Sequence, residues 1–169
     1  MKEYDLNKLL SNSDLVEGLV DGFIADRVLI RQDVDAEEIK GHILKSEHNL
    51  RFVSKIASEF VDWAITGIYY SCYHAALALI QSKGYSSKNH LATLCVMISE
   101  FCGKELSRYD IEMFSGFLDH KDVLFYVESK NKREDATYST KTLFNKKEVE
   151  HLRIQAVLFV NKIKGILYS

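Results

Sequence analysis

The residue types that could act together as a nucleophile and a base lie close together in one segment. Ser71, Cys72 and His74 occur within four residues. Spacings of two and three residues on a buried helix do not make a nucleophile–base pair without a third group. His42 and His48 are six residues apart, which places them on different faces of a helix and makes them a poor pair of metal ligands. We therefore predict no metal site and no cofactor.

Positive charge is concentrated in residues 128–147. This stretch has six basic and three acidic side chains, a local charge of +3, in a chain whose net charge is −2. A long connection without helical patterning is uncommon in a compact domain and is often functional, although a solvated surface loop explains the charge equally well. Arg133 and Asp135 could form an ion pair that orders the loop, and Tyr138 could pack the loop onto the rest of the domain.

Composition limits the class of protein. The chain has 169 residues, of which 47% are hydrophobic and 27% charged, and no proline, which fits one domain of long helices. The three cysteines lack CxxC spacing and are interpreted as reduced thiols of an intracellular protein. The N-terminal segment has no signal-peptide pattern, and no apolar stretch is long enough to cross a membrane. We expect a cytoplasmic protein without a membrane partner.

Helical periodicity predicts an all-α fold, an up-and-down bundle of about five helices. Residues 1–33 are expected to form a short N-terminal extension that packs on the main body, where Gly18 and Gly22 weaken any helix, and residues 34–169 the helical domain. The first predicted helix begins near Asp35, with Asp33 or Asp35 as its cap, and the second spans about 61–82. The third begins at Ser86 or Ser87 and ends before Gly103, and the fourth spans about 106–128. The last begins after Asn145, where Glu148 completes a capping-box-like pair.

The second helix is apolar nearly all round, which is typical of a central buried helix. One stripe on it is small or polar and follows 4-3-4-3 spacing: Gly67, Ser71, His74, Ala78 and Gln81. Small residues let another helix approach closely, either within the chain or across a two-fold interface. We favour intrachain packing for most of the stripe, with a dimer interface nearby.

Several segments match the pattern of one known family in the same order: Lys45–Arg51, Tyr69-Tyr70, Tyr73-His74-Ala75-Ala76, Ala78-Leu79, Gly84-Tyr85, Lys88-Asn89-His90 and the segment from Arg133 to Tyr138. In these segments the chain resembles the HEPN domains. The resemblance covers about residues 35–167. It implies an up-and-down helical bundle that forms a homodimer. Members of the family are often prokaryotic and are commonly encoded beside a minimal nucleotidyltransferase. Many members are metal-independent ribonucleases or toxins of toxin–antitoxin pairs.

Catalysis in the family rests on an arginine followed by a histidine, R-x4-6-H. The arginine stabilises phosphate charge and the histidine moves a proton. No arginine of this chain has a histidine at that spacing, and Arg133 is followed instead by Tyr138. Tyrosine, with an ordinary pKa of about 10, is a poor base near neutral pH, but an Arg–Tyr pair can still hold a phosphate. The replacement therefore weakens cleavage more than binding.

The resemblance predicts a site for a nucleotide or an RNA phosphate. Its expected residues are Arg133, Asp135, Tyr138, His74, His90, Tyr70 and Lys88. Our first hypothesis is a binding module without strong catalysis, partnered by a minimal nucleotidyltransferase. The alternatives are a ribonuclease toxin with Arg133 and Tyr138 as the catalytic pair, and a purely structural interaction protein in which His74 and the tyrosines serve the core or an interface.

Overall fold

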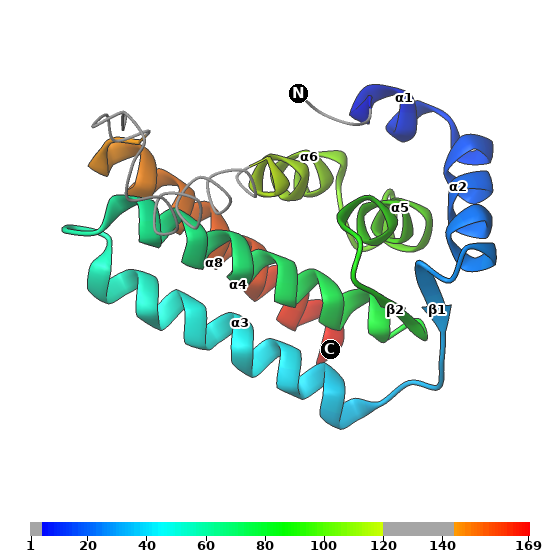
Figure 1. The fold of residues 1–169 in the computed structure, drawn as a ribbon, viewed down its shortest axis with the longest axis horizontal. Coiled ribbons are helices and arrows are strands. Elements are labelled where there is room, and N and C mark those ends of the chain that lie inside the picture. The colour runs from blue at the N-terminus through cyan, green and yellow to red at the C-terminus, as the bar shows by residue number, and fades with distance from the viewer. Residues whose placement is uncertain (1–4, 120–143) are drawn as a thin grey trace, which may run out of the picture.

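The fold is all-α, as predicted, with one very short two-stranded sheet. The computed structural model describes residues 5–119 and 144–169 (Figure 1). The elements are α1 (Leu6–Ser11), α2 (Ser13–Ala25), β1 (Leu29–Arg31), α3 (Ala36–Ile56), α4 (Val61–Gln81), β2 (Tyr85–Ser87), α5 (His90–Phe101), α6 (Arg108–Leu118) and α8 (Lys146–Leu167). The predicted site residues Arg133, Asp135 and Tyr138 lie outside the described residues.

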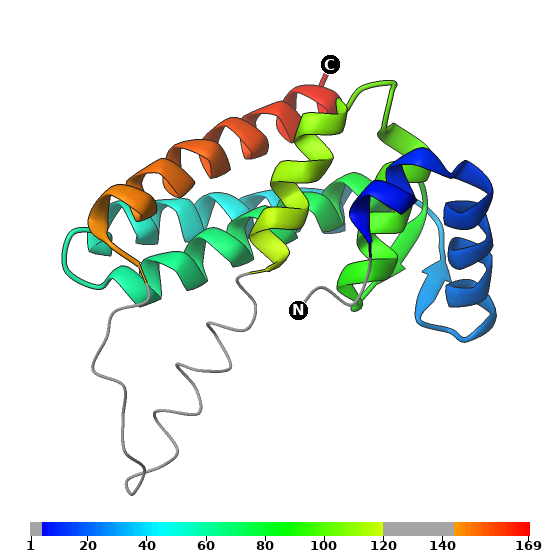
Figure 2. The same cartoon turned by 90° about the horizontal axis from the view of Figure 1, so that it is seen from above.

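Helix α4 is the central element, as its apolar composition predicts. It contacts α3, α5, α6 and α8 (Figures 1 and 2). Fourteen of its residues are buried, including Ile65, Ile68 and Leu79. Because α4 is covered on several sides, its few partly exposed residues mark where neighbouring helices leave it open.

The small-residue stripe of α4 packs against α3 within the chain, as favoured from the sequence. A Cβ atom added to Gly67 would come within 2.6 Å of Val53 Cγ2. One helical turn later, the buried Ser71 hydroxyl donates to the Ser46 carbonyl at 2.9 Å. Since that bond uses the Ser71 proton, the Ser46 hydroxyl donates to Ser71 Oγ, at 3.1 Å. Glycine and serine thus allow the two helices to approach closely.

The ends of the long helices follow local capping rules. The Asp35 carboxylate accepts from the backbone N–H groups of residues 37 and 38 at the start of α3. Asn145 and Glu148 form a complete capping box at the start of α8. The Asn145 cap was predicted, and of the two candidates Asp33 and Asp35 the structure selects Asp35.

Two expectations about helix ends were wrong. Helix α5 is capped by the Asn89 side chain, which accepts from Ala92 N at 2.9 Å, and not by Ser86 or Ser87, because these serines belong to β2. The helix expected over 106–128 corresponds to α6, which ends at Leu118, while residues 120–128 lie outside the described residues. The described part of residues 34–169 holds the five helices α3, α4, α5, α6 and α8, in agreement with the predicted number, and the N-terminal segment adds α1 and α2.

The two strands join the N-terminal segment to the helical body. Strand β1 pairs antiparallel with β2, with Leu29 opposite Ser87. Gly84 precedes β2 with a φ of +75°, and Gln32 O lies 2.7 Å from the position that a Cβ atom would occupy there. Only glycine suits this conformation and this close approach.

The segment before α3 shares the hydrophobic core of the later helices. Leu9, Val16 and Val20 are buried in it, and α2 packs on α5 (Figure 1). Helix α2 runs through Gly18 and Gly22, which had been expected to weaken it. Each glycine costs about 1 kcal/mol of helix propensity, a cost of the same size as the gain from burying one valine.

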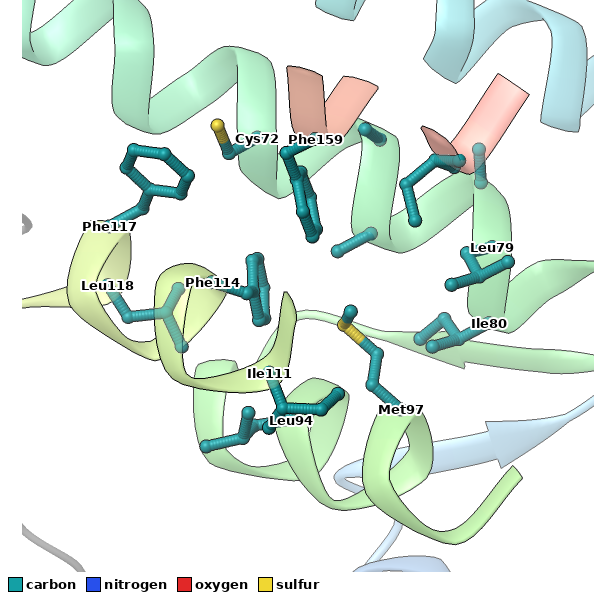
Figure 3. Packing of buried hydrophobic residues seen from close by; sticks show 14 of the residues in the cluster. Cys72, Leu79, Ile80, Leu94, Met97, Ile111, Phe114, Phe117, Leu118 and Phe159 are labelled. Atoms are coloured by element: carbon teal, nitrogen blue, oxygen red, sulfur yellow. The ribbon is translucent and has the colours of Figure 1, made fainter. Parts of the chain in front are cut away.

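Aromatic rings fill the space between α4, α6 and α8. The rings of Phe114 and Phe159 are parallel, with centroids 5.6 Å apart, and Phe117 meets Phe159 edge-on (Figure 3). Cys72 of α4 lies beside them, fully buried. None of the helices within the described ranges is long and apolar enough to cross a membrane.

Candidate functional site

Three tyrosines of α4 and one histidine of α5 form a compact group, which we term the Tyr–His cluster: Tyr69, Tyr70, Tyr73 and His90. The Tyr73 ring stacks on the His90 imidazole with centroids 4.6 Å apart. Tyr69 lies parallel to Tyr73 at 6.0 Å and meets Tyr70 edge-on at 5.0 Å. Tyr69 is buried, whereas Tyr70 is 39% exposed, so the cluster extends from the core to the surface.

A hydrogen bond joins the Tyr69 hydroxyl to His90 Nε2. Burial raises the pKa of Tyr69 well above its usual value, and the neighbouring Tyr73 and Tyr70 add smaller effects in the same direction. The phenol therefore stays neutral. With the neutral phenol as the donor, Nε2 accepts and Nδ1 carries the ring proton. The bond sets the orientation of the His90 ring for either direction of donation.

A second histidine pair lies on the α3–α4 contact. His42 Nδ1 and His74 Nδ1 are 3.0 Å apart, so one imidazole donates to the other. Burial, with repulsion from His42 and Lys45, lowers the pKa of His74 to about 4. Burial also lowers the pKa of His42, against the opposing effect of Glu38. Both imidazoles are therefore neutral at physiological pH, and neither supplies a positive charge for a phosphate.

The structure brings together some of the predicted site residues. Tyr70 and His90 belong to the Tyr–His cluster, and the exposed Lys88 lies two residues before His90. His74 instead pairs with His42 on the α3–α4 contact.

The sequence did not assign the partners of these histidines. The observed partner of the Tyr69 hydroxyl is His90. One sequence signal could have found the His42–His74 pair. Helices α3 and α4 run antiparallel on either side of a short turn, so residues that face each other have numbers with a nearly constant sum. The residue numbers sum to 116 for this pair and to 117 for Ser46 and Ser71.

The described residues do not form a group that could bind a metal ion. No group of three or more histidine, cysteine, aspartate or glutamate residues there is arranged to hold a metal ion. Two imidazoles alone fall short of the four ligands of a structural zinc site.

Fold and site together define a helical-bundle protein with a tyrosine–histidine group on its central helix. No family model matches the chain. The chain is 30% identical over 133 residues to a protein named "Putative toxin MJ0142" from Methanocaldococcus jannaschii. The alignment covers 78% of this chain and 83% of that protein. The chain therefore belongs to the same family as this toxin-named protein.

Proposed function

We propose that this chain is the toxin component of a toxin–antitoxin pair and binds a phosphate group of RNA or of a nucleotide beside the Tyr–His cluster. The observation that carries the proposal is the orientation of His90 by Tyr69 and Tyr73, through one hydrogen bond and one ring stack. A positioned imidazole beside a surface tyrosine offers N–H and O–H donors to a phosphate and an aromatic face to a base.

The same geometry favours binding over strong catalysis. A general base needs an available lone pair near the proton that it removes. The Nε2 lone pair of His90 is engaged by the Tyr69 hydroxyl, whose raised pKa keeps it protonated. A histidine held in this way orients a ligand, and removing a proton from a ribose hydroxyl would first require the Tyr69 bond to break.

The toxin assignment draws support from the family. A relative that shares 30% of its aligned residues with this chain is named a toxin. The HEPN resemblance adds a homodimer and a minimal nucleotidyltransferase as partner, which we propose as the antitoxin. It also adds Arg133 and Tyr138 as the residues that complete the phosphate site.

The test compares two histidine variants in RNA binding. His90→Gln should weaken binding of a fluorescein-labelled single-stranded RNA about tenfold or more in the presence of EDTA, because the oriented imidazole is lost. His48→Gln is the matched control, since His48 is exposed on α3 and is not a member of the cluster. Thermal melting checks that both variants fold. Equal RNA affinity in parent and His90→Gln protein would refute the proposed site.

A second candidate function is a metal-independent ribonuclease. The specific observation in its favour is the partly exposed imidazole of His90, because Nε2 could serve as a base once its bond to Tyr69 is broken. Total RNA incubated with the protein and EDTA should then be cleaved by the parent and not by Arg133→Ala. Intact RNA in both reactions would remove this candidate.

A further inference from the structure

A cavity with two basic side chains, Arg27 and Lys88, lies where the N-terminal segment meets the start of α5. Its volume is about 410 Å³, within the range of small-ligand pockets. Two distant segments line it: the α2–β1 connection with β1, through Arg27, Val28 and Ile30, and β2 with the β2–α5 connection, through Ser86, Ser87, Lys88 and Asn89. The antiparallel pairing of β1 with β2 brings these two connections together.

The charge in this cavity has no partner in the part of the chain that the structure describes. Arg27 and Lys88 both line the cavity, and neither takes part in an ion pair with a described residue. No carboxylate is among the lining residues. Two cations that converge on one cavity repel each other, and an anion bound between them would offset that repulsion.

The remaining walls suit a nucleotide better than a free anion. The Ser86 hydroxyl adds a hydrogen-bond donor, and Val28 and Ile30 supply an apolar surface. Ile30 is 53% exposed, so its side chain is accessible to a ligand in the cavity. A phosphate near the cations and a base or ribose against the apolar wall would use both halves of the cavity.

This cavity adjoins the Tyr–His cluster. Lys88 and Asn89 immediately precede His90, so one short connection carries side chains into both places. We infer that the Arg27–Lys88 cavity binds a second phosphate, with its nucleoside, of the same RNA strand. The assignment to RNA rests on the proposed function, whereas the preference for a phosphate rests on the cavity alone.

The experiment measures two ligands with three variants. AMP should bind more tightly than adenosine by calorimetry, and Arg27→Gln and Lys88→Gln should each weaken AMP about tenfold. Glutamine keeps part of the side-chain length, and at Arg27 it leaves the left-handed backbone (φ 57°) no more strained than the arginine does. Lys55→Gln, an exposed position at the far end of α3, should change nothing. Equal affinity for AMP and adenosine, or unchanged AMP binding in both cavity variants, would overturn the inference.

A salt titration with single-stranded RNA tests the link to the Tyr–His cluster. Loss of one phosphate contact should lower the slope of log K against log salt by about 0.7 in Arg27→Gln and in Lys88→Gln. If these variants weaken RNA and His90→Gln does not, the cavity stands and the proposed function fails. If only His90→Gln weakens RNA, the proposed function stands and the cavity assignment fails.

Discussion

Adding one methyl group to Gly67 should show how closely α3 and α4 approach. The new Cβ would lie 2.6 Å from Val53 Cγ2 and 3.4 Å from Phe52 Cδ1. Val53 is fully buried and β-branched, so its methyl group has little freedom to move away. Overpacking of this kind costs about 1–3 kcal/mol, while replacing a helical glycine by alanine stabilises by about 1 kcal/mol. The net loss of unfolding free energy for Gly67→Ala is therefore about 0–2 kcal/mol.

The matched control isolates the clash from helix propensity. Gly41 lies in α3 with nothing within 4 Å of its added Cβ, so Gly41→Ala should stabilise by up to about 1 kcal/mol. The two substitutions should therefore differ by about 1–3 kcal/mol, which at this chain length is several degrees in Tm. Urea unfolding followed by circular dichroism measures both values.

A double-mutant cycle identifies the contact itself. In a Val53→Ala background the methyl group that the added Cβ would meet is gone, so Gly67→Ala should become stabilising, with a coupling energy of about 1–3 kcal/mol. If Gly67→Ala stabilises the parent as much as Gly41→Ala does, the close α3–α4 approach is refuted. So is the geometry that places His42 beside His74.

Three further predictions concern titrating groups. The pKa of His74 is lowered to about 4, so its contribution to stability is complete above the ordinary histidine pKa of about 6.5 and is lost as pH falls from there toward 4. Tm should decline over that range, and less steeply in His74→Gln; an equal decline in both proteins would contradict this. Burial raises the pKa of the Cys95 thiol to about 12, and it raises the pKa of the partly exposed Cys102 thiol by a smaller amount. Iodoacetamide reacts with the thiolate, so at pH 8 it should modify Cys102 first, as detected by mass spectrometry. Preferential labelling of Cys95 would exclude the described packing. Asp110 is buried in the α6 capping box and bonded to Lys162 at 2.5 Å. Asp110→Ala should lower the free energy of unfolding in urea by about 1–3 kcal/mol, and an unchanged free energy would count against this cap.

The candidate site was only partly visible before the fold was known. Tyr70 and His90 were named from the family resemblance, and the structure places both in one aromatic group. The hydrogen bond that orients His90 comes from Tyr69, which no spacing rule pointed to, because the two residues lie on different helices. Whether Arg133 and Tyr138 complete the site stays a prediction, since both lie outside the described residues.

Local sequence determined the helices and most of their ends. Periodicity and capping act within one or two turns, so Asp35, Asn145 and the apolar character of α4 were sufficient to predict them. The same reasoning failed at α5, where pairing of β2 with β1 took Ser87 into a strand and left the cap to Asn89.

Tertiary structure alone decided which distant residues meet. The His42–His74 pair, the Tyr69–His90 bond and the Arg27–Lys88 cavity each join segments at least 21 residues apart. Such contacts depend on how whole helices pack and on the loop-closure entropy that packing offsets, neither of which is written in a local pattern. The sequence therefore determined the parts of the bundle, and the packing of those parts determined the chemistry that they present.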